Sequence, residues 1–334
     1  MHYSLSTAAL KFSNVGDYAI TVSLGSNPNY NVTPTNGNLH ISPKTASVSA
    51  DDKSKTYGQA NPALTAAVVG QVAGGAAINY SLSITAIQCS NVGNYMITVT
   101  LGSNPNYNVT PTNGTLTITK AHLTVTADNK SKAYDGNPFT AFTVTITGFV
   151  TACGDTVAVV SGGATYTGSA VGATLPGNYT ITPQQGTLTA TNYDFPVGNF
   201  VNGTLTIGYG TCTGPNPGGV ILPPINTDGS SVWKVGSTVP VKFTVCGANG
   251  QPISDPTAVF TSGYGSITLI NTVRGTVNGV NESTYNDIPD SAFRWSSGIW
   301  IFNMATANLD KNATYSYRIA LKNGSFVYFT AGTK

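Results

Sequence analysis

The sequence contains few charged residues. Asp, Glu, Lys and Arg make up 8% of its 334 residues, whereas typical soluble domains contain about 25%. Its polarity comes instead from Gly, Ser, Thr and Asn. The 15 Lys and Arg residues are scattered between Lys11 and Lys334, and the formal net charge is +2. Because binding of a polyanion needs clustered basic residues, this distribution argues against nucleic acid as a partner.

Paired carboxylates for acid–base catalysis are also scarce. Glu282 is the one glutamate in the sequence. The nearest acidic pairs are Asp51-Asp52 and Asp287 with Asp290, and both lie in turn-rich stretches. Such stretches favour solvated turns over a catalytic pair.

The histidines and cysteines also show no pattern typical of a catalytic or metal site. The three histidines, His2, His40 and His122, are far apart, and the four cysteines form no CxxC motif. A Ser-His-Asp arrangement or a zinc site therefore has little to build on. We predict that the protein is not an enzyme and has no cofactor or metal site.

Long hydrophobic runs are missing as well. No stretch approaches the roughly 18 apolar residues of a membrane span, and residues 1–12 lack the basic and apolar regions of a signal peptide. The sequence therefore predicts no membrane span. The first residues fall inside a repeat, so a secretion signal upstream of Met1 stays compatible with it.

The sequence does contain internal repeats. Residues 3–42 align with residues 80–119 without a gap at an offset of 77, and GSNPNYNVTPTNG stands unchanged at 25–37 and 102–114. A more divergent third copy ends with NGTLTI at 202–207. Successive units of this kind indicate a tandem array.

Hydrophobic residues alternate within each copy. In NYMITVTLG, Tyr95, Ile97 and Val99 face one way, and the residues between them face the other. Period two over five to eight residues, bounded by Gly, Asn and Pro, is typical of a strand with one buried face. We therefore predict an all-β fold built from tandem small β-sandwich or β-grasp-like modules.

The stretch repeated without change is predicted to be a turn region between the last two strands of a module. Its prolines fix φ and remove backbone donors, and its Asn-Gly pair suits a tight turn. Asn, Pro, Thr and Gly supply no strong nucleophile and no group that titrates near neutral pH. The stretch is therefore expected to be architectural.

The first copy lacks a counterpart of residues 44–79. Half a sandwich cannot enclose a core. Two explanations follow: residues 1–43 begin inside a longer array, or strands from another chain complete this module by β-augmentation.

The last third of the chain differs from the repeats. Residues 209–230 are rich in Gly and Pro and are predicted to be a linker. Beyond them, VPVKFTV alternates, and FRWSSGIWIFNM and TYSYRIALKNGSFVYFTAG are typical of hairpins. We expect a C-terminal immunoglobulin-like sandwich. The predicted modules are 1–43 (incomplete repeat), 44–120, 121–208, the linker 209–230 and the terminal domain 231–334.

Two stretches of the chain resemble known families. LTVTADNKSKAYDGNP (123–138), GFVTACGDT (148–156) and NYDF with FVNGTLTI (192–207) resemble the MBG/YDG-type repeats of large bacterial surface proteins. GSTVPVKF (236–243) and the aromatic hairpin at 293–302 resemble a PxKF-type C-terminal domain. These resemblances imply a secreted or surface-anchored array, and neither family supplies catalytic residues.

The cysteines suggest one disulfide. Cys212 in the linker and Cys246 at the end of VPVKFTV are 34 residues apart. In an oxidising compartment a bond between them would stabilise the last domain by roughly 3–4 kcal/mol. Cys89 aligns with Phe12 and is expected to be a small apolar residue, since it can pair with Cys153 only if adjacent units bring the two together.

The tryptophans are candidates for ligand contacts. Trp295 and Trp300 share one face of a hairpin, where a sandwich core is favoured over a sugar-stacking strip. Trp233, next to Lys234, is expected to be partly exposed. Nine N-x-S/T sequons are possible glycosylation sites: Asn31, Asn108, Asn113, Asn129, Asn178, Asn202, Asn281, Asn312 and Asn323.

These patterns together favour a structural protein at the cell surface. We predict an extracellular stalk or adhesin-type repeat protein that provides spacing and attachment. Its partners would be further copies of itself, surface proteins or glycans. One alternative is a self-assembling filament subunit joined through the incomplete first module. A second alternative is a glycan-binding module that uses the tryptophans.

Overall fold

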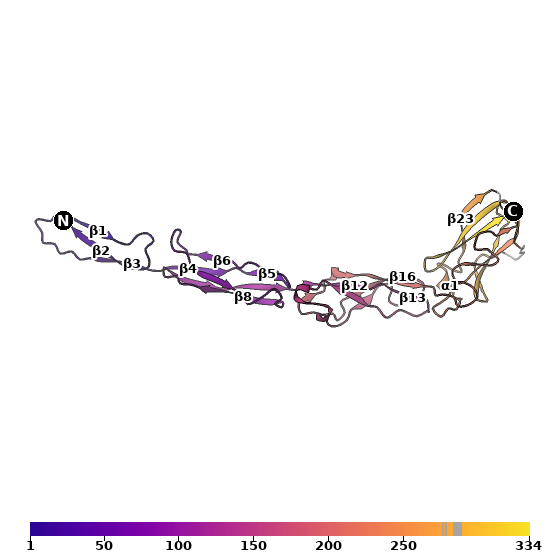
Figure 1. Ribbon diagram of the computed structural model, residues 1–334, viewed down its shortest axis with the longest axis horizontal. Coiled ribbons are helices and arrows are strands. Elements are labelled where there is room, and N and C mark those ends of the chain that lie inside the picture. The colour runs from indigo at the N-terminus through magenta and orange to yellow at the C-terminus, as the bar shows by residue number, and fades with distance from the viewer. Residues whose placement is uncertain (276, 278, 283–288) are drawn as a thin grey trace. The chain divides into compact units, whose positions relative to one another are not determined.

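The computed structural model describes residues 1–275, 277, 279–282 and 289–334. Nearly all regular elements in these ranges are strands (Figure 1). The exceptions are the short helix α1 (Pro256–Val259) and three 3-10 turns, η1 (Thr151–Cys153), η2 (Val157–Val159) and η3 (Val197–Asn199). The fold is all-β, as the alternating pattern predicts. No helix in the described ranges is long and apolar enough to cross a bilayer.

Backbone contacts divide the chain into two compact units. The first unit comprises residues 1–123, 148–161 and 189–194, and the second comprises residues 124–147, 162–188 and 195–334. The first two repeats lie wholly in the first unit, and the third repeat supplies residues to both.

The first repeat, in the first unit, is a single sheet. β1 (Tyr3–Thr7), β2 (Gly16–Leu24) and β3 (Gly37–Ile41) pair antiparallel in the order β1-β2-β3. Residues 1–45 are all described, and none of them is buried. The sheet therefore has an apolar face without a core, as expected for half a sandwich.

The second repeat has two sheets. Its strands are β4 (Lys44–Ala50), β5 (Lys53–Thr56), β6 (Ala66–Val69), β7 (Tyr80–Ser83), β8 (Gly93–Leu101), β9 (Tyr107–Thr112) and β10 (Gly114–Thr119). One sheet has the order β6-β4-β9 and the other β5-β10-β8-β7. This arrangement is the sandwich form of the prediction and not a β-grasp.

The core of the second repeat lies between these sheets. Val48 on β4 and Ile97 on β8 are completely buried, as is Leu116 on β10. The predicted inward face of β8, which carries Ile97 and Val99, is therefore correct. Because each buried aliphatic side chain stabilises a fold by about 1.5–3 kcal/mol relative to an exposed one, this core holds the repeat together.

The stretch GSNPNYNVTPTNG, which is identical at 25–37 and 102–114, has a different structure in each of the two repeats. In the second repeat most of it forms β9, which pairs parallel with β4. In the first repeat, residues 25–36 contain no strand. The prediction of a turn region was wrong for the second copy, because pairing with β4 converts the segment into an edge strand. Pro111 is tolerated there because an edge strand leaves one side unpaired.

The first unit also contains part of the third repeat. β11 (Ala121–His122) and β17 (Tyr193–Asp194) pair parallel, and η1 and η2 lie in the loop at 148–161.

In the second unit, the rest of the third repeat forms two sheets with the strand order of the second repeat. β14 (Val144–Thr147), β12 (Thr124–Ala127) and β18 (Phe200–Val201) form one sheet. β13 (Lys130–Ala133), β19 (Gly203–Gly208), β16 (Gly177–Gln184) and β15 (Thr165–Thr167) form the other. Ile181, Leu205 and Ile207 are buried between them.

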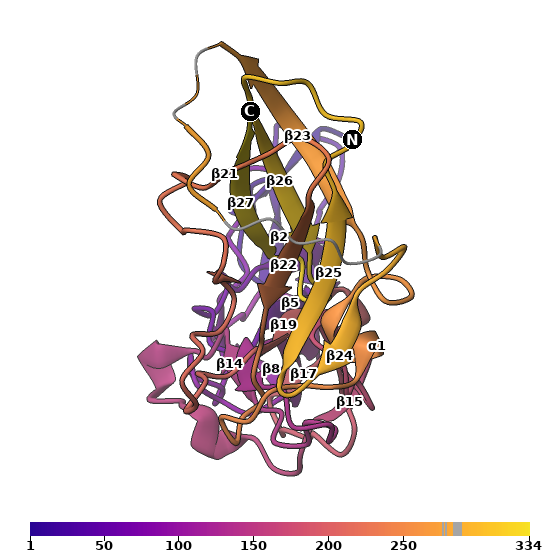
Figure 2. The same ribbon diagram turned by 90° about the vertical axis from the view of Figure 1, so that its right-hand side faces the viewer.

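The C-terminal module of the second unit is an immunoglobulin-like sandwich of two four-stranded sheets. The first sheet contains β20 (Ile221–Leu222), β22 (Thr238–Phe243), β25 (Ile299–Ala305) and β24 (Arg294–Ser296). The second contains β21 (Val232–Trp233), β27 (Phe326–Thr333), β26 (Ala313–Ala320) and β23 (Ile267–Arg274). Figure 2 shows the strands of both sheets.

Residues 209–230, predicted to be a linker, fold onto this module. They supply β20 to its first sheet, and Ile221 and Ile225 are buried in its core. The amide of Gly210 donates to the carbonyl of Cys246 at 2.7 Å. The Gly and Pro content therefore marks an irregular path along a sheet and not a free connection.

Candidate functional site: the junctions between modules

At the junction between the first and second repeats, one asparagine makes two hydrogen bonds. The Asn106 side-chain oxygen accepts a hydrogen bond from the backbone amide of Val15 at 2.9 Å. Its side-chain nitrogen donates to the Asn14 side-chain oxygen at 2.9 Å. Because both halves of the amide are used, the turn at Asn14-Val15 can dock on the second repeat in one orientation.

The same pair of hydrogen bonds occurs between the second and third repeats, within the first unit. Asn192 accepts from the amide of Val92 at 3.0 Å and donates to the side-chain oxygen of Asn91 at 2.9 Å. Asn91 and Val92 stand 77 residues after Asn14 and Val15. We name this recurring pair of hydrogen bonds, made by Asn106 or Asn192, the asparagine bridge.

A tyrosine follows each bridging asparagine and fixes the loop that presents it. Tyr107 accepts from the amide of Val72 at 3.1 Å and donates to the carbonyl of Ala76 at 2.8 Å. Tyr193 accepts from the amide of Val150 at 2.8 Å and donates to Asp155 at 2.5 Å. Burial, helped by the Asp155 carboxylate, raises the pKa of Tyr193 to about 12. Such a phenol stays protonated and holds its hydrogen bonds across the neutral range.

A disulfide crosslinks the second junction. Cys89 is bonded to Cys153 in η1, with 5.6 Å between their Cα atoms and 64 residues between them in sequence. The expectation that Cys89 is only a small apolar residue was wrong. Docking of the repeats brings the two cysteines together, and this proximity cannot be deduced from their spacing.

The first junction uses an aromatic ring at the corresponding position. Phe12 aligns with Cys89, and a Cβ placed on Gly74 would lie 3.2 Å from the tip of the Phe12 ring. The ring therefore packs closely on the loop that corresponds to η1. At the second junction Tyr57 also packs edge-on against Tyr193, with ring centroids 5.5 Å apart.

The junction between the third repeat and the C-terminal module, in the second unit, is apolar. Leu175 takes the position of Asn91, since Tyr179 donates to its carbonyl as Tyr95 donates to that of Asn91. Leu175 packs against the core of the C-terminal module. An asparagine bridge is thus replaced by a hydrophobic contact at this end.

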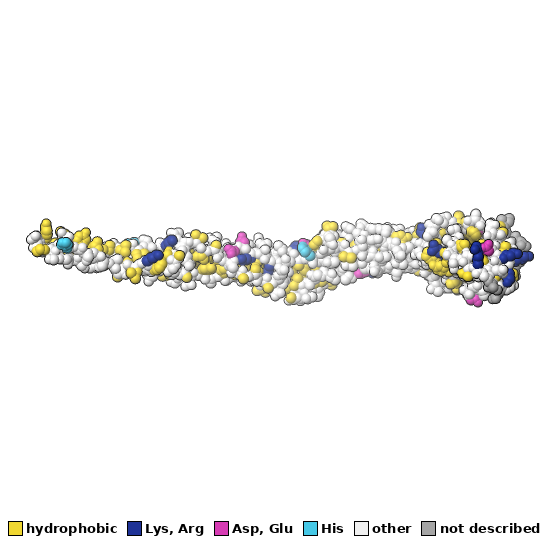
Figure 3. Space-filling model, turned by 90° about the horizontal axis from the view of Figure 1, so that it is seen from above, with side chains coloured by type: hydrophobic (Ala, Val, Ile, Leu, Met, Phe, Trp, Pro, Cys, Tyr) yellow, Lys and Arg dark blue, Asp and Glu magenta, His cyan; other side chains and the backbone are white. Residues whose placement is uncertain are grey.

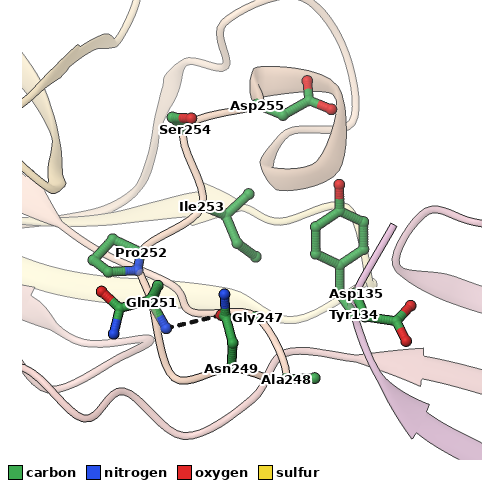
Figure 4. Close-up of a pocket in the computed structure, with 10 residues that line it drawn as sticks. All are labelled: Tyr134, Asp135, Gly247, Ala248, Asn249, Gln251, Pro252, Ile253, Ser254 and Asp255. Carbon is green, nitrogen blue, oxygen red and sulfur yellow. Dashed lines mark hydrogen bonds between the residues drawn. The ribbon is translucent and has the colours of Figure 1, made fainter. Parts of the chain in front are cut away.

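A hollow of about 580 Å³ lies beside this junction. Figure 4 shows the Tyr134 ring on one side of it and Pro252 and Ile253 on the other. The Tyr134 carbonyl accepts from the amide of Ala248 at 2.7 Å, which ties the third repeat to the C-terminal module. Burial and the nearby carboxylates of Asp255 and Asp135 raise the pKa of the Tyr134 phenol.

Both carboxylates of this hollow are already engaged. Asp135 pairs with Lys132 at 2.5 Å, which holds its pKa below the usual value. Asp255 caps α1 by accepting from the amide of Thr257 at 2.9 Å. The hollow therefore offers hydrogen bonds and one aromatic ring but not an acid–base pair.

The acidic residues considered as catalytic pairs in the sequence analysis accept hydrogen bonds that hold loops in place. Asp51 accepts a hydrogen bond from the Thr65 hydroxyl, and Asp52 accepts from the amide of Thr115 at 2.7 Å. Asp290 accepts from the amide of Asn303 at 2.8 Å, and Asp287 lies outside the described residues.

Two of the three histidines have an aspartate partner. His40 lies 2.7 Å from Asp17 and His122 lies 2.5 Å from Asp194, and both pairs are exposed. Within the described ranges, no group of three His, Cys, Asp or Glu side chains could hold a metal ion.

The candidate ligand-facing tryptophans are mainly core residues. Trp300 is fully buried and donates to the carbonyl of Ile253 at 3.0 Å. Trp233 is also fully buried, so the expectation that it is partly exposed was wrong. β21 pairs parallel with β27 at the edge of the second sheet, and Trp233 belongs to the core of the C-terminal module. Trp295 is half-buried and packs against Trp300 in a tilted arrangement, with ring centroids 5.2 Å apart, so a glycan would find at most one of the three rings accessible.

The sequon asparagines lie mostly at the surface, and Asn323 is half-buried. Several use the side-chain amide within the fold. Asn113 accepts from the amide of Val99 at 2.9 Å, and Asn129 accepts from the amide of Thr204 at 2.8 Å. These asparagines close turns between strands.

The disulfide expected from the sequence is present in the second unit. Cys212 and Cys246 are bonded, with 5.2 Å between their Cα atoms. The bond ties residues 209–230 to the C-terminal module.

Sequence reasoning missed the asparagine bridge. A signal was available, because SNVG recurs at 13–16 and 90–93 and Asn-Tyr recurs at 106–107 and 192–193. What the sequence does not reveal is that the two motifs bind each other across a junction.

Comparisons with known proteins agree with the repeat organisation. A family model described as "MBG domain (YGX type)" matches residues 2–40, 46–117 and 123–206. No curated protein sequence matches the chain.

Several solved structures match the chain at low similarity. A tandem of titin domains is 11% identical, with a TM-score of 0.23, and the match covers 86% of this chain and 98% of that one. Three N-terminal domains of the bacteriophage RB49 outer capsid protein Hoc are 10% identical, with a TM-score of 0.22, covering 99% and 98%. Extracellular domains 3–5 of Drosophila OTK are 12% identical, with a TM-score of 0.19, covering 96% and 92%.

Proposed function

Because the chain belongs to the family of MBG domains of the YGX type, we propose that it is an extracellular tandem-repeat protein that provides spacing and attachment without catalysis. The observation that carries this proposal is the asparagine bridge, which recurs with the same geometry at two successive junctions. A bridge that repeats sets the same orientation at each step of an array. The length of such a repeat protein increases with the number of its modules.

The composition of the surface supports an extracellular location. Two disulfides join all four cysteines, and stable disulfides are typical of oxidising compartments. In Figure 3, white polar groups and yellow apolar side chains cover most of the visible face, and charged groups occur in isolated places. Such a surface offers hydrogen bonds to many partners and strong attraction to none.

The junctions are suited to transmit tension. At the second junction, a pulling force meets the Cys89–Cys153 bond, the Asn192 bridge and the Tyr57–Tyr193 contact together. The hydrogen bonds resist rotation, and the covalent bond limits extension. A spacer that bears load needs both properties.

We assign the C-terminal module, as part of the same proposal, to a PxKF-type terminal domain. GSTVPVKF includes β22, and the aromatic hairpin is β24–β25. The glycan-binding alternative loses most of its support, since Trp233 and Trp300 are buried.

Small-angle X-ray scattering of the full chain tests the spacing role. A strand of eight to ten residues spans about 30 Å, so we expect a maximum dimension on the order of 100 Å or more. N106A combined with N192A should shift the distance distribution to shorter values, because both bridges lose their orienting hydrogen bonds. N38A, at an exposed site away from the junctions, is the matched control. A wild-type profile typical of a flexible chain, or one unchanged by the double substitution, would contradict the proposal.

A further inference from the structure

The hollow beside Tyr134 lies at a tyrosine that two of the repeats share. Tyr57 and Tyr134 occupy corresponding positions, in KSKTYG and KSKAYDG. Tyr57 is 5% exposed, because Tyr193 of the following repeat packs edge-on against it with ring centroids 5.5 Å apart. The hydroxyl of Tyr193 in turn donates to the Asp155 carboxylate at 2.5 Å. At the second junction, a hydroxylated ring that is held by a carboxylate thus covers the shared tyrosine.

Tyr134 lacks this cover. Its ring is half-buried and makes no ring-to-ring contact with another described residue. The C-terminal module places the Asp255 carboxylate near it, but among the described residues that line the hollow Tyr134 alone is aromatic. The hollow of about 580 Å³ lies between this ring and the loop of residues 247–255 (Figure 4). Its volume is within the range of about 300–1,000 Å³ that is typical of small-ligand sites.

The walls of the hollow are fixed by the fold. The amide of Tyr134 donates to the carbonyl of Gly208 at 2.8 Å, and the carbonyl of Tyr134 accepts from the amide of Ala248 at 2.7 Å. A Cβ at Gly247 would lie 3.0 Å from the Tyr134 carbonyl, so a glycine there permits the close approach of the loop. On the opposite wall Ile253 is buried in the core. A preformed site avoids the cost of ordering its walls when a ligand binds.

The polar side chains around the hollow have unused hydrogen-bonding groups. Asp255 uses Oδ1 to accept from both the amide and the hydroxyl of Thr257, at 2.9 and 2.8 Å. Asn249 uses its side-chain oxygen to accept from the amide of Gln251 at 3.0 Å. The groups without a hydrogen-bond partner among the described residues are Asp255 Oδ2, Asn249 Nδ2, the Tyr134 hydroxyl and the side chains of Gln251 and Ser254. The hollow thus combines one aromatic ring with several free donors and acceptors.

This combination fits a neutral sugar. The C–H bonds on one face of a pyranose carry partial positive charge, and the face of an aromatic ring is partially negative. Sugar hydroxyls donate to carboxylate oxygens and accept from amides, and a hydrogen bond to a carboxylate is roughly twice as strong as one between neutral groups. A phenol from a protein partner would use one polar group of the hollow and leave the others without a partner.

The charges of the hollow exclude acidic sugars. Two of its described lining residues, Asp135 and Asp255, are acidic, and none is basic. A sugar that carries a carboxylate or a sulfate would therefore be repelled.

We propose that the hollow between Tyr134 and the loop of residues 247–255 is a binding site for a neutral sugar of a glycan chain. One face of the pyranose packs on the Tyr134 ring, and its hydroxyls form hydrogen bonds with Asp255 and Asn249. The site is separate from the tryptophans. The inference names a partner class for the attachment role and rests on that part of the proposed function, whereas the spacing role stands without it.

The proposal is tested by exposing the full chain to an array of neutral glycans that end in glucose, galactose, mannose or N-acetylglucosamine, and of acidic glycans that end in sialic or uronic acid. We expect binding to at least one neutral glycan and to none of the acidic ones. Isothermal titration with the methyl glycoside of the bound terminal sugar then gives the dissociation constant.

Substitutions in the hollow should weaken this binding. Y134A should raise the dissociation constant at least tenfold, because the sugar loses its stacking surface. D255N should raise it severalfold, because asparagine still caps α1 but lacks the negative charge. Y328A is the matched control and should leave the dissociation constant unchanged, because Tyr328 is 58% exposed on β27 and does not line the hollow.

A blocking variant decides the matter if Y134A does not fold. Ser254 is exposed, and its side chain has no hydrogen-bond partner in the part of the chain that the structure describes. S254W should therefore fill the hollow without disturbing the core. We expect it to abolish sugar binding while the thermal unfolding midpoint stays at the wild-type value.

Three results would overturn the proposal. One is the absence of binding by every neutral glycan at millimolar concentrations. Another is a wild-type dissociation constant in folded S254W, which would place the sugar elsewhere. The third is binding of N-acetyltyrosinamide, abolished by S254W, without binding of any sugar, because the occupant would then be a protein side chain. None of these results changes the scattering profile that tests the spacing role, so the two proposals fail separately.

Discussion

Removal of the Cys89–Cys153 disulfide should lengthen the part of the chain that a pulling force can extend. The perturbation is the double substitution C89S with C153S. In the wild-type protein the bond holds two residues 64 positions apart at a Cα–Cα distance of 5.6 Å. Because an extended chain spans at most about 3.6 Å per residue, the variant should gain about 220 Å of contour length.

The same substitution should lower stability. A crosslink removes loop entropy from the unfolded chain, and for a loop of this size the chain-entropy estimate is about 4 kcal/mol. The loss should appear in the first unit, which contains both cysteines. We expect earlier unfolding of the second repeat in urea.

Single-molecule force spectroscopy of the chain held at its two ends measures the length directly. C212S with C246S is the matched control, because it opens a loop of 34 residues and should add only about 120 Å. A reductant should convert the wild-type trace into one with both increments. If wild type and the C89S/C153S variant reach the same contour length without reductant, the crosslink does not form and the account of the second junction is refuted.

The remaining predictions concern the cores and the junctions. I97A should destabilise the second repeat by about 2–5 kcal/mol in urea unfolding, because Ile97 is fully buried, whereas I20A at the corresponding position should have a much smaller effect. N192A should lower stability by about 1–3 kcal/mol through the loss of two hydrogen bonds. Tyr193 has a raised pKa of about 12, so its contribution to stability is complete below pH 10 and is lost as the pH rises towards 12. Absorbance titration of the phenols, compared between wild type and Y193F, measures the pKa of Tyr193.

Each of these predictions has a contradicting outcome. Equal destabilisation by I97A and I20A would mean that the first repeat has a core of its own. An unchanged midpoint for N192A would mean that the bridge is too exposed to contribute. A wild-type titration that exceeds that of Y193F by one phenol near pH 10 would show that Tyr193 does not hold its proton more tightly than a free phenol.

The sequence was sufficient for the parts of the fold that depend on local pattern. The period-two pattern identified the inward positions of β8, and the offset of 77 identified the repeats. The Cys212–Cys246 pair was also expected from the sequence, because a bond between these positions would tie residues 209–230 to the last domain.

The sequence was insufficient wherever one module touches another. Cys89 and Cys153 meet only after two repeats dock, and Trp233 is buried because β21 places it in the core of the C-terminal module. The asparagine bridge joins motifs that lie about 91 and 101 residues apart. Such contacts are tertiary, and neither propensity nor periodicity encodes them.

The unchanged thirteen residues explain how a repeat can have different structures at different places in the array. Local sequence permits a strand at 30–35 and at 107–112, but only a neighbouring strand produces one. In the third repeat, Leu175 takes the position of Asn91, the residue that a bridging asparagine contacts, and it packs against the C-terminal core instead. The residue at this position thus distinguishes a junction between two repeats from the junction with the C-terminal module.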